Sequence, residues 1–194
     1  MKLLLKEKLI SLVLIYGIIF IPMWIMFFIG RIIPVEHFLG IEPRTFQFKE
    51  LFGIFFSWLA HYNLMHITNN SIMLLGLLCP VIIFERKPYH LLISLIGLSG
   101  FLTWLLGGNN TLHFGASGLV FAIFSYITSS LLLNKRVEYL IPIAFFGLYY
   151  GVAYFTSFAQ GLVPTQFISF AAHFGGLISG IIVVLIQKKI KRQI

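Results

Sequence analysis

Long stretches without a charged residue constrain this chain more than any other feature of its sequence. Four stretches contain no Asp, Glu, Lys or Arg: residues 9–30, 51–84, 88–134 and 139–187. A helix that crosses a bilayer needs about 20 mostly apolar residues, so the first two stretches predict one spanning helix each. Each of the last two is long enough for two helices and contains a polar break, at 107–113 and 159–166. The sequence therefore predicts six membrane spans.

The composition agrees with this interpretation. Charged residues make up 10% of the 194 residues, whereas about 25% of a typical soluble domain is charged. The predicted fold class is an all-α integral membrane protein, a bundle of six transmembrane helices that forms a single domain over residues 1–194. The predicted spans are residues 9–30, 62–84, 88–106, 115–134, 138–158 and 168–187, and an outer loop is expected at 31–61.

The distribution of positive charge predicts the orientation of this bundle. If the N-terminus is cytoplasmic, all but three of the 14 lysines and arginines lie on the cytoplasmic side, and the exceptions are Arg31, Arg44 and Lys49. This asymmetry is the positive-inside bias of multi-pass membrane proteins. We therefore expect both termini in the cytoplasm. This bias accounts for the net charge of +8. The expected partner is therefore the lipid bilayer, and no nucleic-acid partner is expected.

This orientation places several polar side chains at one depth in the membrane. The second, fourth and sixth helices would run from outside to inside, so their N-terminal ends lie near the outer face. Polar residues occur at those three ends: His61, His66 and Asn70, then Ser117, then His173. Polar side chains are costly inside a membrane and by default indicate a functional site.

Each of these features also has a simpler structural explanation. The small residues at 115–118 (GASG) and the G-x3-G pattern at 176–180 are both typical of helix-packing surfaces. His61 would serve equally well to hold the outer loop in place. The other outer histidines, His37 and His113, are expected to be solvated.

Together, however, these residues have the chemistry of amide hydrolysis, which needs a nucleophile, a base and donors for the oxyanion. Ser117 supplies a hydroxyl at a helix N-terminus, where backbone N–H groups are free, and His173 supplies a base suited to neutral pH. His66 and Asn70 are four residues apart, so they share a helix face, and both can donate. Asn69 lies loosely on the same side, and spacing alone does not choose between the asparagines. All six carboxylates lie either on the cytoplasmic side or in the outer loop, so none is available inside the membrane to orient His173, which favours a Ser–His dyad over a triad.

Three motifs carry a resemblance to a known family. They are H-x4-H-x3-N at 61–70, G-x-S-G at 115–118 and A-H-x2-G-x3-G at 172–180. In this order they resemble the motifs of the rhomboid intramembrane serine proteases. The resemblance extends over the six-helix core, from about residue 8 to 188.

The resemblance implies a role for each residue of the site. Ser117 would be the nucleophile and His173 the general base. His66, Asn70 and the backbone amide of Ser117 would form the oxyanion hole. The resemblance implies supporting roles for six residues: Gly115, Gly118, His61, Phe121, Gly176 and Gly180. Gly115 would give backbone clearance, His61 would be a structural histidine, and Phe121 would be the aromatic surface on which the base packs.

The implied activity is cleavage of transmembrane segments of other membrane proteins near the outer face, in a bacterial inner membrane. No metal or organic cofactor is expected, and the oligomeric state is left open. One departure is Phe52-Gly53, where many relatives carry a Trp-Arg pair, which puts the usual packing of the outer loop in question. Two alternatives stay open: a catalytically inactive relative that binds membrane proteins, and a small transporter or channel.

Overall fold

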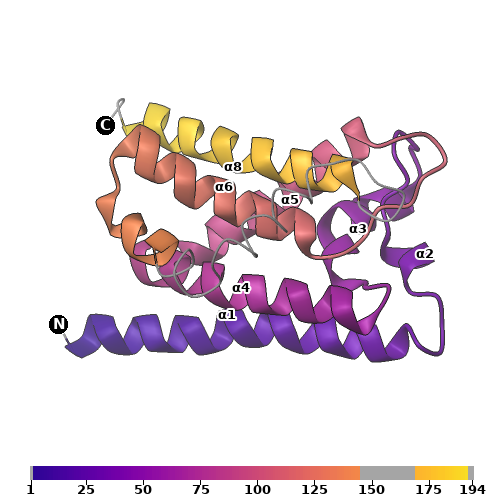
Figure 1. Cartoon of the computed structure of the whole chain (residues 1–194), viewed down its shortest axis with the longest axis horizontal. Coiled ribbons are helices and arrows are strands. Elements are labelled where there is room, and N and C mark those ends of the chain that lie inside the picture. Colours follow the sequence, from indigo (N-terminus) through magenta and orange to yellow (C-terminus); the bar gives the residue numbers. More distant parts are fainter. Residues whose placement is uncertain (1, 145–168, 192–194) are drawn as a thin grey trace.

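The computed structural model describes residues 2–144 and 169–191, and this part of the chain is mainly helical (Figure 1). Five helices are long and apolar enough to cross a membrane: α1 (Lys2–Ile29), α4 (Leu64–Phe84), α5 (Pro88–Leu106), α6 (Ser117–Asn134) and α8 (Phe170–Lys191). They coincide with five of the six predicted spans. The span predicted at 138–158 begins within a short 3-10 helix, η2 (Val137–Tyr139), and lies mostly outside the described residues.

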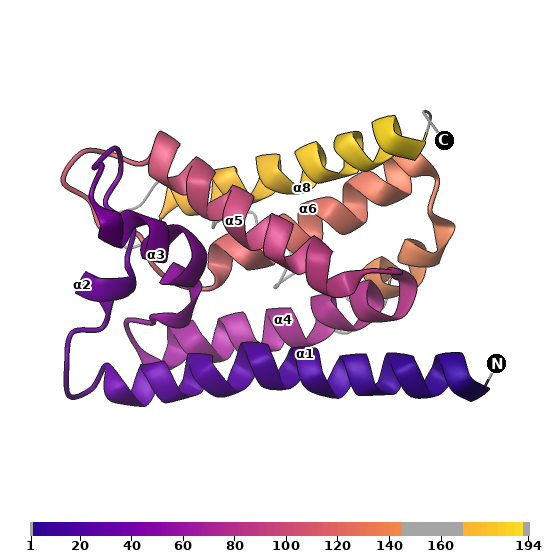
Figure 2. The same ribbon diagram turned by 180° about the vertical axis from the view of Figure 1, so that it is seen from behind.

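The helices are arranged so that α4, α6 and α8 begin at the same end of the bundle. This is the end that carries the long loop after α1, and the two chain termini lie at the opposite end (Figure 1). α1 runs beside α4, while α6 packs along α8 and α5 contacts both of these helices (Figures 1 and 2). The polar residues at the starts of α4, α6 and α8 are therefore brought to one end of the bundle.

Local sequence signals account for several helix ends. The side chain of Asn63 accepts a hydrogen bond from the backbone N–H of His66 at 2.8 Å and so caps the start of α4. Pro88 occupies the first turn of α5, where its missing N–H costs nothing. At the end of α6, Lys135 adopts a left-handed conformation with φ of 53° and its N–H bonds to Ser130.

Glycines set the close approach of α8 to α6. A Cβ atom placed on Gly180 would lie 2.5 Å from the carbonyl oxygen of Ala122, and one placed on Gly176 would clash with the carbonyl oxygen of Gly118. Neither position has room for a side chain. Small residues allow such contact between membrane helices, where packing rather than the hydrophobic effect drives association. The G-x3-G pattern therefore packs helices, as its structural interpretation predicted.

The loop between α1 and α4 contains three short helices, α2 (Glu36–Leu39), α3 (Phe48–Phe56) and η1 (Ser57–Leu59). Gly53 in α3 faces the backbone of Gly40, and a Cβ atom there would lie 2.9 Å from the Gly40 oxygen. The loop thus packs backbone against backbone at the second residue of the Phe52-Gly53 pair. Ile41 in turn pairs with His113, each backbone N–H donating to the other's carbonyl at 2.8 and 2.9 Å.

The opposite end of the bundle is held by a polar cluster around Glu85, the residue that ends α4. The carboxylate of Glu85 forms an ion pair with Arg136 and accepts a hydrogen bond from the hydroxyl of Tyr139 at 2.5 Å. Lys8 donates to the backbone oxygen of the same residue. These bonds connect α1, α4 and η2 far from the residues that the sequence places in the site.

Candidate active site

Ser117 is the first residue of α6, and a turn that depends on a glycine places it there. Gly115, two residues earlier, has φ of +115°, a conformation that residues with a Cβ atom rarely adopt. Its N–H donates to the carbonyl of Ser57 at 2.9 Å, which fixes the turn against η1. Ser117 itself is half-buried. As the first residue of a helix it presents a backbone N–H that the helix cannot satisfy.

His66 lies directly against this turn. A Cβ atom on Gly115 would be 2.6 Å from Cε1 and 2.8 Å from Nε2 of His66, so a glycine is required for the ring to fit. His66 comes from the first turn of α4, whose start is fixed by the Asn63 cap. The structure therefore brings His66 beside the backbone that leads into Ser117.

His173 lies in the first turn of α8 and is 6% exposed. Its ring stacks on Phe121 of α6, with ring centroids 4.3 Å apart and planes 8° apart. Phe121 follows Ser117 by four residues, one helical turn, so the imidazole is held on the same side of α6 as the serine. His173 is also close enough to His66 for their rings to interact electrostatically.

His61 forms hydrogen bonds through both ring nitrogens, and its Nε2 connects Asn70 to the turn before Ser117. Its Nδ1 donates to the carbonyl of Leu59 at 3.3 Å, so its Nε2 carries no proton and accepts. Two N–H groups reach that nitrogen, from the side chain of Asn70 at 3.0 Å and from the backbone of Ala116 at 3.3 Å. His61 thus ties the start of α4 to the turn before Ser117.

Burial keeps His61 in this neutral form. It is 4% exposed, and burial, reinforced by the neighbouring His66 ring, lowers the pKa of His61 to about 3. The rings of the two histidines are 4.9 Å apart and meet edge to face. A neutral acceptor at Nε2 orients the Asn70 amide, which leaves its second amide hydrogen for another acceptor.

The structure separates the two neighbouring asparagines that spacing could not. Asn70 is 6% exposed and bonded to His61, whereas Asn69 is exposed. The difference follows from the rotation of α4 about its axis, which depends on how the helix packs against α1 and α6.

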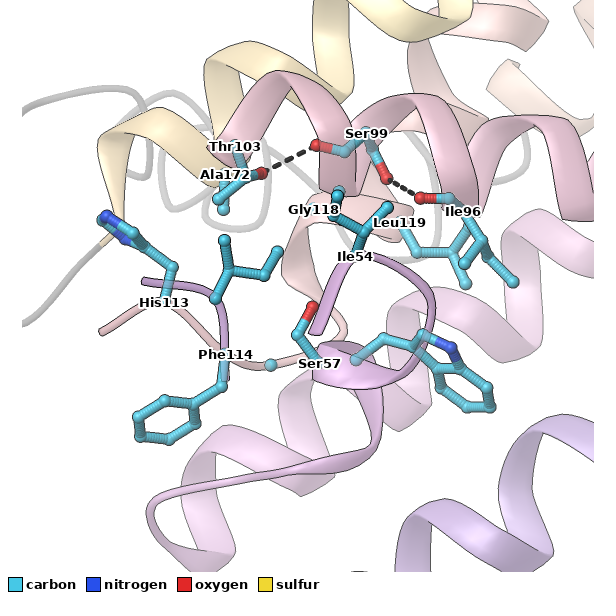
Figure 3. A pocket seen from close by; sticks show the side chains of 14 residues that line it. Ile54, Ser57, Ile96, Ser99, Thr103, His113, Phe114, Gly118, Leu119 and Ala172 are labelled. Carbon is cyan, nitrogen blue, oxygen red and sulfur yellow. Dashed lines mark hydrogen bonds between the residues drawn. The ribbon is translucent and has the colours of Figure 1, made fainter. Parts of the chain in front are cut away.

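A small cavity opens beside Gly115 and Gly118 (Figure 3). Its volume of about 20 Å³ is enough for roughly one water molecule. Hydroxyl groups of Ser57, Ser99 and Thr103 contribute to its lining. Ser99 and Thr103 donate to carbonyls of their own helix, at 3.1 and 2.7 Å, so their oxygens remain able to accept from water.

His113 is one residue that the sequence did not single out. It was expected to be solvated, like His37, and His37 is indeed exposed. His113 is instead one of the residues that line the cavity (Figure 3). Its ring nitrogens bond to Ser169 and Thr111, at 2.7 and 2.8 Å. Ser169 lies 56 positions further along the chain, and no local pattern signals that pairing.

The arrangement supplies the components of acyl transfer. The Ser117 hydroxyl, the His173 imidazole that stacks on the residue one helical turn beyond it, and the donors of His66, Asn70 and the start of α6 lie at one end of the bundle. Among the residues that the structure describes, no group of three His, Cys, Asp or Glu side chains is placed to hold a metal ion.

The fold and this cluster define a class: a multi-pass helical membrane protein whose polar side chains gather at the N-terminal ends of three helices. The family is identified by a model described as the Rhomboid domain, which matches residues 49–189. The match covers most of the chain, and the chain belongs to the rhomboid family. A comparison with curated proteins finds no match.

Proposed function

We propose that the chain is an intramembrane serine endopeptidase that cleaves transmembrane segments of other membrane proteins, with Ser117 as nucleophile and His173 as general base. The observation that carries this proposal is the stacking of His173 on Phe121, one turn beyond Ser117, with a ring-centroid distance of 4.3 Å. A histidine held in that way has a defined position relative to the hydroxyl, which proton transfer requires.

The proposed reaction follows from these positions. Ser117 attacks the scissile carbonyl as His173 takes the hydroxyl proton, and the oxyanion accepts hydrogen bonds from His66, Asn70 and the Ser117 N–H. His173 then protonates the leaving amine, which departs as the acyl-enzyme forms. Water, deprotonated by His173, attacks the ester, and His173 returns the proton to the Ser117 oxygen as the acyl–oxygen bond breaks and the second product leaves. The substrate must be unwound at the cleaved bond, because a helix uses its own carbonyls in hydrogen bonds.

The same proposal includes the topology on which the site depends. Six spans, with both termini in the cytoplasm of a bacterium and the site near the outer face of its inner membrane, agree with the positive-inside bias. Gly115, Gly118, Gly176 and Gly180 would act by allowing close contact rather than by touching substrate. The fifth span in chain order, 138–158, lies largely outside the described residues.

Two measurements on the purified protein in detergent test the activity. The unmodified chain should react with a fluorophosphonate probe and cleave a model transmembrane peptide, and both Ser117→Ala and His173→Ala should abolish cleavage. Ser179→Ala is the matched control, because Ser179 is fully buried and its hydroxyl donates to Gly176 of its own helix at 2.7 Å. An unmodified chain that neither reacts nor cleaves would identify a catalytically inactive member of the family.

A further inference from the structure

A hydrogen bond joins the two segments that carry Ser117 and His173, and each of its two residues lies four positions before a member of the dyad. Nδ1 of His113 lies 2.7 Å from the hydroxyl oxygen of Ser169. His113 precedes Ser117 by four residues, and Ser169 precedes His173 by four residues. The start of α6 and the start of α8 are therefore linked through two side chains, each four residues before the nucleophile or the base in the sequence.

The protons of this link are fixed by its neighbours. The hydroxyl of Thr111 donates to the carbonyl of Gly108 at 2.6 Å, so its oxygen must accept from Nε2–H of His113 at 2.8 Å. Nδ1 of His113 is then unprotonated and accepts from the hydroxyl of Ser169. Burial lowers the pKa of His113, which favours this neutral form.

Ser169 also caps the helix that carries the base. Its hydroxyl oxygen accepts from the backbone N–H of Ala172 at 3.1 Å, and its carbonyl accepts from the N–H of His173 at 3.1 Å. A serine in this position satisfies N–H groups that the first turn leaves free. Because the same hydroxyl donates to His113, the cap sets the position of the first turn of α8 relative to the loop before α6.

The dyad is held from its other side by backbone contact. A Cβ atom on Gly118 would lie 3.3 Å from the carbonyl oxygen of Ala172, and the carbonyl oxygen of Gly118 faces Gly176. His173 thus lies between a glycine contact that limits the distance between α6 and α8 and a hydrogen bond that limits the rotation of its first turn. The loop that holds His113 is itself paired with Ile41.

We propose that His113 is a positioning residue that, through Ser169, holds His173 in register with Ser117. This inference rests on the proposed protease function. A misplacement of about 1 Å can cost roughly 10²-fold in rate even when the changed residue is remote from the chemistry. Breaking the bond between His113 and Ser169 should therefore lower kcat and leave KM nearly unchanged.

Four variants of the full-length protein in detergent separate positioning from helix stability. His113→Leu removes the link and leaves the cap. Ser169→Gly also removes the link but keeps most of the capping free energy, because glycine is nearly as good an N-cap as serine. Ser169→Thr keeps both functions of the hydroxyl. His37→Leu, at the exposed outer histidine, is the matched control for a change of histidine in the loops.

Peptide cleavage and the rate of fluorophosphonate labelling are measured for each variant, together with the unmodified chain and Ser117→Ala. We expect kcat to fall about tenfold to a hundredfold in His113→Leu and Ser169→Gly, with KM within about twofold. A double variant that combines His113→Leu with Ser169→Gly should be no slower than the slower of the two single variants, because both changes remove one shared interaction. Ser169→Thr and His37→Leu should retain kcat within about threefold.

Several results would overturn the inference while the protease function stands. One is a near-normal kcat in both His113→Leu and Ser169→Gly, and another is a rise in KM with kcat unchanged. The others are losses in kcat that multiply in the double variant, and a loss of activity in Ser169→Thr. Absence of cleavage and labelling in the unmodified chain would instead overturn the protease function, and the inference with it.

Discussion

Replacing Asn70 by alanine tests the oxyanion hole directly, because the adjacent Asn69 provides a matched control. The amide nitrogen of Asn70 lies 3.0 Å from Nε2 of His61, and the residue is 6% exposed. The bond uses one amide hydrogen and fixes the plane of the amide, so the second hydrogen has a defined direction. Asn69 is exposed and should have no comparable role.

The expected magnitude follows from the number of donors lost. The proposed hole has three donors, from His66, Asn70 and the Ser117 N–H, and Asn70→Ala removes one. Loss of one such donor lowers kcat by about 10²–10³-fold, or ~2.7–4 kcal/mol of transition-state stabilisation. The effect on folding is smaller. His61 still accepts from Ala116 at 3.3 Å, so we expect a loss of about 1 kcal/mol in the free energy of unfolding.

The assay compares kcat, KM and thermal stability of the unmodified chain, Asn70→Ala and Asn69→Ala on one detergent-solubilised substrate. Asn70→Ala should lose at least about 100-fold in kcat with KM nearly constant, since the interaction forms only in the transition state. Asn69→Ala should change kcat by a few-fold at most. Equal losses would indicate a general packing defect, and a larger loss at Asn69 would refute the proposed register of α4.

Three further predictions concern topology, pH and packing. In a chain freed of its native cysteine, a cysteine at Asn110 should react with an impermeant reagent from outside, and one at Lys135 only after permeabilisation; the reverse pattern would invalidate the proposed orientation. Burial lowers the pKa of His61 in the folded chain to about 3, from its ordinary value of 6.5. Between these two pH values only the unfolded chain protonates His61, so the contribution of neutral His61 to the free energy of unfolding should be complete above about pH 7 and fall as pH drops through 6.5, by about 2 kcal/mol at pH 5. A His61→Gln variant whose thermal unfolding shows the same pH profile as the unmodified chain would contradict this prediction. Gly176→Val should lower stability by about 1–3 kcal/mol through overpacking against Phe121, and an unchanged melting temperature would show that α8 shifts freely.

The five described spanning helices followed from the sequence because their signals are local. A run of apolar residues long enough to cross a bilayer needs no tertiary information, and residues at helix starts, such as the cap Asn63 and the first-turn Pro88, act within one turn. The residues proposed for the site could be singled out from the sequence by type, because a serine, a histidine or an asparagine inside an apolar helix is costly wherever the helix packs. Their convergence at one end follows from the alternation of helix direction along the chain.

Rotation and pairing between segments had to come from the tertiary structure. The sequence left Asn69 and Asn70 equivalent, and the packing of α4 buries one and exposes the other. His113 was expected to be solvated, yet it bonds to Ser169, because two loops distant in sequence meet only after α5, α6 and α8 have packed. Such contacts depend on how each helix is turned about its axis. That angle is set by side-chain packing over the whole bundle, and no local period in the sequence encodes it.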